Sequence, residues 1–110
     1  MSFSVLPTAR FRREAKPLSK KYASFKEDLE DLITLLEQDA NQGESLGGGL
    51  NKVRLAITSK GKGKSGGSRV ITFVVLRRAE VYLIAVYDKS EKDSLSQGEM
   101  AELRKSLPQV

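Results

Sequence analysis

Four basic side chains lie in and beside the apolar segments of the central part of the chain, where they could act together on a phosphate. Lys52 and Arg54 are two residues apart in an alternating segment, so both point to one face of the predicted strand. Arg69 lies in a second apolar segment, and Lys89 comes just after a third. If Arg69 faces the same way as the first pair, the cations converge, and they can then bind and orient successive phosphates.

Such a cluster can also cleave RNA without a metal ion. Attack by the 2′-hydroxyl needs a base near the nucleophile, positive charge beside the phosphorane and a proton for the leaving oxygen. A lysine whose pKa is lowered by neighbouring cations can serve as base or acid, and arginine, always charged and bidentate, suits the equatorial oxygens. The alternative is that these cations only solubilise an edge strand. Arg69 argues against it, because its same-face neighbours Ile71 and Phe73 are apolar and a charge there needs a partner or a purpose.

A loop made almost entirely of Lys, Gly and Ser joins the first two predicted strands, over residues 59–67. A cationic loop held between two strands is suited to presenting charge to a polyanion. The residues predicted to bind RNA phosphates are Lys60, Lys62 and Lys64 in this loop and Arg77 after the second strand.

The end of this loop, Gly63-Lys64-Ser65, invites comparison with the phosphate-binding loop of nucleotide hydrolases. That pattern needs a glycine where Thr58 stands, and a helix where a strand is predicted to follow. We therefore set nucleotide hydrolysis aside.

The composition narrows the chemistry further. The chain has 110 residues and contains neither cysteine nor histidine, which excludes disulfides, thiolate or imidazole metal sites and His-based triads. We expect no metal and no cofactor, and we interpret the acidic residues of the second predicted helix as a solvated face. The net charge of +5 favours an acidic partner, nucleic acid or protein, although a plain soluble basic domain explains it about equally well.

Nothing in the sequence indicates a membrane or an exported protein. No apolar run approaches the roughly 20 residues that span a bilayer. The first ten residues lack the charged start and long apolar stretch of a signal peptide. We expect a cytoplasmic location and no membrane partner.

The first third of the chain predicts a short strand and two helices. The strand at residues 2–6 ends at Pro7, and Thr8 is the expected N-cap of the first helix. Pro17 should kink that helix or split it, and a capping box from Ser24 to Glu27 should start the second. The apolar stripes comprise Phe11, Ala15, Leu18 and Tyr22 on the first helix and Phe25, Leu29, Leu32, Ile33 and Leu36 on the second.

Three strands and a helix are predicted to follow, over residues 50–58, 68–76, 80–87 and about 96–106. Both faces of the second and third strands are apolar, which indicates a central position in the sheet. Alternation on the third strand groups Val81, Leu83, Ala85 and Tyr87 on one face, and Tyr82, Ile84, Val86 and Asp88 on the other. The sequence therefore predicts a single α+β domain over residues 1–110: strand, two helices, a three-stranded antiparallel meander and a short C-terminal helix capped by Ser96 and Glu99.

Residues 46–96 resemble the RelE/ParE superfamily of bacterial toxin–antitoxin modules, most closely its RelE and HigB-like branch. The matching segments are Leu50-Asn51-Lys52-Val53-Arg54-Leu55, the loop Gly61 to Ile71, Val81-Tyr82-Leu83, and Tyr87 to Ser96. The predicted order of elements agrees over nearly the whole chain.

The resemblance implies a RelE-like fold and a ribosome-dependent mRNA endonuclease that is neutralised by a cognate antitoxin. Its partners would be the antitoxin, the ribosome and mRNA. By position, the resemblance makes Lys52, Arg54, Arg69 and Lys89 the catalytic set. The sequence departs from RelE near Leu95, where a tyrosine is expected, and leucine can neither stack nor exchange a proton; Tyr87 is an alternative source of an aromatic ring.

Two other functions stay open at this point. ParE members of the superfamily poison DNA gyrase without cutting RNA, and fold alone does not separate the two activities. A basic binding module without catalysis is the third possibility. The convergent Lys/Arg face favours RNA cleavage.

Overall fold

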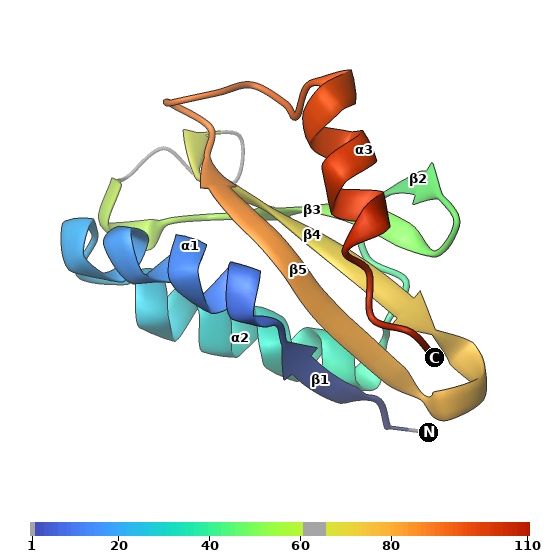
Figure 1. Ribbon diagram of the computed structural model, residues 1–110. Coiled ribbons are helices and arrows are strands. Elements are labelled where there is room, and N and C mark those ends of the chain that lie inside the picture. Colours follow the sequence, from blue (N-terminus) through green and yellow to red (C-terminus); the bar gives the residue numbers. More distant parts are fainter. Residues whose placement is uncertain (1, 61–65) are drawn as a thin grey trace.

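A five-stranded sheet carries two helices on one face and one on the other (Figure 1). The computed structural model describes residues 2–60 and 66–110. The elements are β1 Ser4–Pro7, α1 Ala9–Lys21, α2 Phe25–Gln38, β2 Glu44–Gly47, β3 Leu50–Leu55, β4 Ser68–Val75, β5 Glu80–Asp88 and α3 Gln97–Lys105, with short 3-10 turns at Thr58–Lys60 and Leu76–Arg78. The predicted α+β class is confirmed, and the predicted elements occur in the expected order, with one additional strand, β2, between α2 and β3.

The strands run in the order β1-β5-β4-β3-β2. β3, β4 and β5 pair antiparallel and form the predicted meander, whereas β1 pairs parallel with β5. β4 and β5 are interior strands, as their two apolar faces indicated. Each face of the sheet is covered, so both faces can bury side chains.

β2 is a strand that the sequence reading did not find. It pairs antiparallel with β3, so that Glu44 lies opposite Lys52. Gly47, Gly48 and Gly49 all have positive φ and form the turn between the two strands. A run of glycines between two short segments is a hairpin signal, since glycine adopts positive φ without strain.

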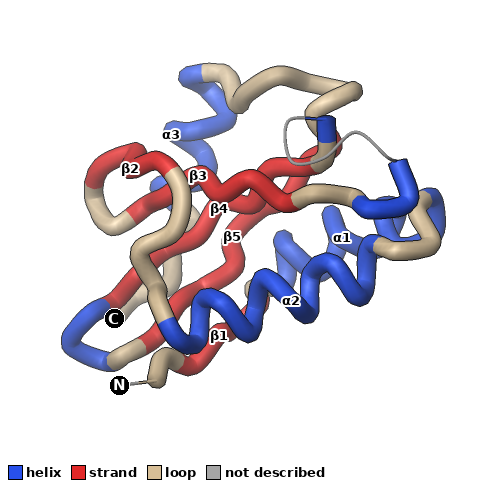
Figure 2. Tube along the Cα trace, turned by 180° about the vertical axis from the view of Figure 1, so that it is seen from behind, coloured by secondary structure: helices blue, strands red, loops and turns tan. Residues whose placement is uncertain are grey.

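The two N-terminal helices lie side by side against one face of the sheet (Figure 2). Thr8 caps α1 as predicted: its side-chain oxygen accepts a hydrogen bond from the Phe11 N–H at 3.2 Å. Pro17 does not split the helix; α1 continues as one element through Lys21.

The predicted capping box at the start of α2 is wrong. The helix begins at Phe25, but the Ser24 side chain makes no capping hydrogen bond. Its hydroxyl instead donates to Asp28 at 2.8 Å and accepts from the Ser59 N–H at 2.8 Å. A contact between Ser24 and the 3-10 turn after β3 therefore replaces the predicted capping hydrogen bond within the helix.

Apolar residues form one core on each face of the sheet. The first joins α1 and α2 to the sheet and includes the predicted helix residues Phe11, Leu18, Phe25, Leu32 and Leu36. The second lies under α3, where Leu103 is fully buried against the sheet. The predicted capping box of Ser96 and Glu99 is present and starts α3 at Gln97.

A β-bulge in β5 overturns the predicted alternation of that strand. Ile71 pairs with Ala85 while Thr72 pairs with Leu83, so Ile84 is an extra residue. Val86 consequently packs in the helix-side core, and Ala85 and Tyr87 pack under α3. The second half of β5 thus faces opposite to the prediction, because one inserted residue reverses every side chain beyond it.

Candidate functional site

A row of three side chains crosses the sheet at one end of the meander. Arg54 of β3 pairs with Arg69 of β4, and Arg69 pairs in turn with Tyr87 of β5. Directly paired residues point to the same face, with Cβ atoms about 4.5–5.5 Å apart. The condition set by the sequence, that Arg69 share a face with Arg54, is therefore met.

Arg54 and Arg69 place two like charges opposite each other on neighbouring strands. Two like charges directly opposite on neighbouring strands destabilise a sheet by roughly 0.2–1 kcal/mol. Arg54 is exposed, but Arg69 is only 5% exposed, and its guanidinium donates to the Ser68 carbonyl at 3.1 Å. The exposed Arg54 is therefore the member of the pair that is open to a negatively charged ligand.

Lys52 lies two residues before Arg54 on the same face, about 7 Å further along β3. Its ammonium group is 3.6 Å from a carboxylate oxygen of Glu44 on β2, at the surface of the sheet. Lys52 thus has β2 beside it and does not lie on an open edge. Solubilising an edge strand does not account for it.

All four predicted catalytic residues line one open groove of about 890 Å³. Its walls are α2, the free part of the β3 edge, and the segment that follows β5. The basic lining residues are Lys52, Arg54, Arg69 and Lys89. Acidic residues also line the groove: Asp28, Asp31, Glu44 and Asp93.

Lys89 is held at the groove by its backbone. Its N–H donates to the Gly67 carbonyl at 3.1 Å, which ties the residue after β5 to the residue before β4. The side chain is half-buried. The structure therefore brings the fourth predicted residue to the same groove from a strand that is not adjacent to β3.

The residues predicted to bind phosphate do not gather in one place. Lys62 and Lys64 lie outside the described residues. Arg77 lies in the 3-10 turn beyond the far end of β4, which is about 20 Å from Arg69 for six strand residues, and it does not line the groove. Lys60 points to the helix side, where its ammonium nitrogen is 3.0 Å from Asp88 and its side chain is only 11% exposed.

Asp88, the last residue of β5, is the centre of a polar cluster that the sequence reading missed. Its carboxylate accepts hydrogen bonds from the Tyr22 hydroxyl at 2.5 Å, the Ser90 hydroxyl at 2.7 Å and the Ser90 N–H at 2.9 Å, besides the Lys60 contact. Burial alone would raise the pKa of Asp88, but these donors outweigh it and hold the pKa well below its ordinary value. No local sequence signal marks Asp88, because only the bulge turns it toward α1.

Tyr87 is an aromatic residue that pairs directly with one of the predicted cations, Arg69, across β4 and β5. It is 8% exposed, and its hydroxyl has no hydrogen-bond partner among the described residues. Burial raises the pKa of Tyr87, and the charge of Arg69 opposes that shift. Leu95 packs in the same core beneath α3, so the apolar residue at this position contributes to packing.

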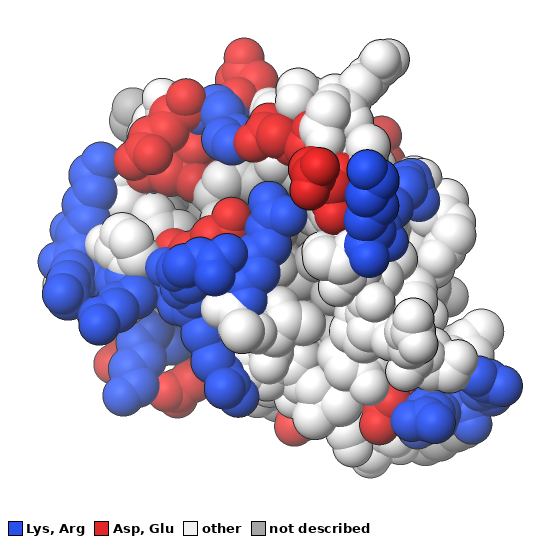
Figure 3. Space-filling model, viewed as in Figure 1, with Lys and Arg blue, Asp and Glu red and all other residues white. Residues whose placement is uncertain are grey.

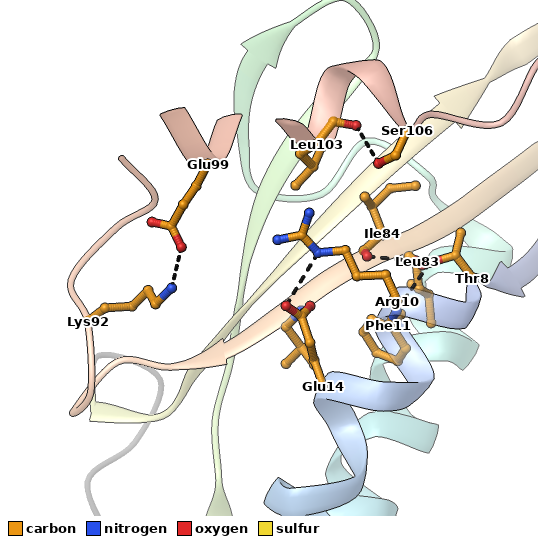
Figure 4. A network of polar contacts seen from close by, with 11 residues as sticks. Thr8, Arg10, Phe11, Glu14, Leu83, Ile84, Lys92, Glu99, Leu103 and Ser106 are labelled. Carbon is orange, nitrogen blue, oxygen red and sulfur yellow. Dashed lines mark hydrogen bonds and ion pairs between the residues drawn. The ribbon is translucent and has the colours of Figure 1, made fainter. Parts of the chain in front are cut away.

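Ionic and polar contacts fasten α3 beside the site. Lys92 is 2.5 Å from Glu99 in the first turn of the helix (Figure 4), and its ammonium group lies 5.9 Å from the centre of the Tyr87 ring. At the other end, Arg104 donates to the Leu46 carbonyl at 3.0 Å. Among residues 2–60 and 66–110, no group of three or more acidic side chains is placed to hold a metal ion.

Comparison with known proteins decides the family. The family model described as the RelE toxin of the RelE / RelB toxin-antitoxin system matches residues 4–109. The chain belongs to the RelE toxin family. It is thus a toxin of a toxin–antitoxin module, and membership implies a cognate antitoxin as its partner.

Solved structures agree with this fold. The free state of a doubly substituted E. coli toxin RelE matches with a TM-score of 0.60 at 17% identity, covering 98% of this chain and 100% of that one. The isolated E. coli RelE toxin matches with a TM-score of 0.57 at 15% identity, covering 96% and 100%. In the part of the chain that the structure describes, no helix is long and apolar enough to cross a membrane.

Proposed function

We propose that this toxin is a ribosome-dependent mRNA endonuclease that inhibits translation. The observation that carries the proposal is the cross-strand pair of Arg54 and Arg69, with Lys52 and Lys89 lining the same groove. Cations from β3, β4 and the segment after β5 thus line one open groove. Family membership supports an RNA-cleaving toxin over an unrelated basic domain.

The proposed reaction is a transfer of the phosphate within the RNA strand. The 2′-oxygen attacks the adjacent phosphorus, its proton passes to a base, the bond from phosphorus to the 5′-oxygen breaks, and that oxygen takes a proton from an acid. Lys52 and Lys89 are the candidates for proton transfer. Arg54 and Arg69 would hold the equatorial oxygens, where negative charge grows in the transition state.

The second candidate is a toxin that does not cut RNA, either a ParE-type gyrase inhibitor or a catalytically inactive basic binding module. Two observations favour it. Arg69 is almost fully buried, and Leu95 stands where the resemblance implies a tyrosine. A groove that binds a polyanion without completing proton transfer would have these properties.

The test replaces the central arginine and follows both targets in cells. Induced wild-type protein should stop growth, and primer extension should show mRNA breaks within translated codons that disappear when translation is blocked beforehand. Arg69→Ala should abolish both, with a loss of cleavage of about 100-fold or more for a missing transition-state contact. The matched control is Arg78→Ala, an exposed arginine in the turn after β4, which should cut like wild type.

The outcomes separate the candidates. A folded Arg69→Ala variant that still breaks mRNA would refute the assignment of the site. Intact mRNA with DNA breaks and an SOS response after wild-type induction would identify a gyrase inhibitor. Absence of toxicity would identify a binding module.

A further inference from the structure

Lys89, the last of the predicted catalytic residues, lies between two residues that are hydrogen-bonded to each other. The Asp88 carboxylate accepts from the Ser90 hydroxyl at 2.7 Å and from the Ser90 N–H at 2.9 Å. An aspartate that accepts from the N–H two residues further on closes a tight turn, and the central residue of this turn is Lys89. Asp88 and Ser90 therefore hold the backbone of Lys89 between them.

The backbone at Lys89 is fixed by two further contacts. The Lys89 N–H donates to the Gly67 carbonyl at 3.1 Å, which continues the ladder of β4 and β5 by one residue. The Asp88 carbonyl accepts from the N–H of Glu91 at 3.0 Å and from that of Lys92 at 3.2 Å. The place from which the Lys89 side chain starts is thus set by the sheet on one side and by the following turn on the other.

The Asp88 side chain can hold this turn because it is itself anchored. It is fully buried, and it accepts from the Tyr22 hydroxyl at 2.5 Å and from the Lys60 ammonium group at 3.0 Å. Tyr22 follows α1, and Lys60 ends the 3-10 turn after β3. Rotation of the Asp88 carboxylate would break contacts with both segments, so the turn around Lys89 is tied to the body of the protein.

The anchor and the groove lie on opposite sides of the sheet. The Asp88 side chain points to the helix side, whereas Tyr87 before it packs under α3 and pairs with Arg69. Because neighbouring side chains of an extended chain alternate, the residue after Asp88 turns back to the side of Arg69. Lys89 lines the groove together with Arg54 and Arg69, in agreement with this alternation.

This segment contributes a position to the groove and no excess of positive charge. Residues 88–96 contain two Lys and three Asp or Glu. In the space-filling view, Asp and Glu side chains lie beside Lys and Arg over the segment between β5 and α3 (Figure 3). Its charge alone does not attract phosphate. The lysine stem is long and flexible, so a defined place for the Lys89 ammonium group depends on a fixed backbone.

We propose that Asp88 and Ser90 are positioning residues, which hold Lys89 where it can exchange a proton with the RNA. The proposal rests on the proposed function, in which Lys89 either accepts the proton of the 2′-hydroxyl or donates one to the leaving 5′-oxygen. Proton transfer needs the two heavy atoms within about 2.6–3.2 Å, and a displacement of about 1 Å can lower a rate about 100-fold. Asp88 is fully buried and acts through Lys89 without touching the RNA.

The test compares single-turnover cleavage in two backgrounds. The substrate is a 5′-labelled mRNA bound to purified ribosomes, and both the limiting rate and the half-saturating toxin concentration are measured. Asp88→Asn removes a buried charge and destabilises the whole protein, so Ser90→Ala, a change at an exposed position, carries the test with and without Lys89→Ala. Ser90→Thr is the conservative variant that retains the hydroxyl. Ser94→Ala, at an exposed serine of the same segment, is the matched control.

Ser90→Ala should lower the limiting rate about 10-fold and leave the half-saturating concentration within about 2-fold of the wild-type value. Ser90→Thr should restore the rate to within about 3-fold, and Ser94→Ala should cleave like the wild type. In the Lys89→Ala background, Ser90→Ala should change the rate by less than about 2-fold, because the group that it positions is absent. An equal loss in both backgrounds would overturn the proposal, since an effect of Ser90 on folding alone does not depend on Lys89.

Tyr22→Phe tests the anchor of Asp88 in the same way. It removes one donor to the Asp88 carboxylate and keeps the aromatic ring. The limiting rate should fall in the wild-type background and not in the Lys89→Ala background. A fall of the same size in both would show that Tyr22 acts on cleavage independently of Lys89, which contradicts the proposal.

Amide hydrogen exchange gives a readout that needs no cleavage. The Lys89 amide should exchange at least about 10-fold faster in Ser90→Ala than in Ser94→Ala, whereas the amides of β4 should keep their protection. An unchanged Lys89 amide, or equal loss of protection throughout β4, would overturn the proposal.

Failure of this proposal is distinguishable from failure of the proposed function. If the wild-type protein leaves ribosome-bound mRNA intact, the proposed function fails. If the wild type cuts, Lys89→Ala does not and Ser90→Ala cuts at the wild-type rate, only the positioning role fails. Full cleavage by Lys89→Ala would also overturn it, because Lys89 would then have no step for which to be positioned.

Discussion

Replacing Asp88 by asparagine should be among the most damaging conservative changes in this protein. The Asp88 side chain is fully buried and accepts four hydrogen bonds, from Tyr22, Lys60 and twice from Ser90. Asparagine keeps one acceptor oxygen but turns an NH₂ group toward donors. It also leaves the Lys60 ammonium group, whose side chain is 11% exposed, without its counter-ion.

Removing one partner of a buried ion pair lowers the free energy of unfolding by about 3–5 kcal/mol. Because asparagine retains one acceptor oxygen, we expect Asp88→Asn to lie near the lower end of this range, at about 3 kcal/mol. For a chain of this size, with a shift of about 4 °C for each kcal/mol, the unfolding temperature should fall by about 12 °C. The assay is thermal unfolding at pH 7 followed by circular dichroism. Asp93→Asn, the same change at an exposed position in the segment after β5, should shift the transition by less than about 2 °C.

The destabilisation caused by Asp88→Asn should become smaller as the pH falls. Hydrogen bonds hold the pKa of Asp88 below its ordinary value despite burial, so the native state stabilises the charged form. This contribution is complete above the unfolded pKa of about 3.9 and is lost as the pH falls through the lower folded pKa. The gap between wild type and Asp88→Asn should therefore narrow below about pH 4. Equal unfolding temperatures for Asp88→Asn and Asp93→Asn at pH 7, or a gap that widens in acid, would refute the reasoning.

Other elements of the fold give further predictions. Glu99→Gln should loosen the start of α3, because the hydrogen bond from Lys92 and the contacts of the capping box stabilise the charged carboxylate and lower the pKa of Glu99 to about 2. Amide hydrogen exchange at residues 97–105 should therefore be faster than in the wild type at pH 7, and unchanged protection would contradict this. Gly67→Ala should destabilise the protein by more than about 2 kcal/mol, since the added Cβ would lie 2.3 Å from the Leu55 carbonyl oxygen. The control is Gly98→Ala within α3, where the nearest atom to the added Cβ, the Ser96 hydroxyl oxygen, is 3.9 Å away. This substitution should raise the free energy of unfolding, measured in urea, by about 0.5–1 kcal/mol. Similar shifts for both substitutions would show that the close approach at Gly67 does not matter.

Local patterns in the sequence were sufficient for most elements. The start of α1 at Thr8, the capping box of α3 and the interior position of β4 and β5 all depend on neighbouring residues or on the polarity of a single segment. These features depend on residues close together in the sequence, so tertiary contacts do not alter them. β2 was missed because a strand of four residues after a polar stretch has almost no periodicity of its own.

The candidate site was predictable in residue type but not in geometry. The alternation of Lys52 and Arg54 predicts that they share a face, and a buried arginine in an apolar strand indicates a special role for Arg69. Whether Arg69 faces the same groove depends on the register between β3 and β4, which a shift of one residue would reverse. The position of Lys60 against Asp88 depends likewise on contacts between segments 28 residues apart.

The amino-acid sequence by itself determined the α+β class, the helices, the antiparallel meander and the set of cations around which the site is built. Only the tertiary structure decided where the second half of β5 points, because the extra residue Ile84 reverses it: Tyr87 joins Arg69 under α3, and Asp88 turns to Tyr22 and Lys60 on the helix side. A bulge is a property of two strands paired together, and a one-dimensional alternation cannot encode it.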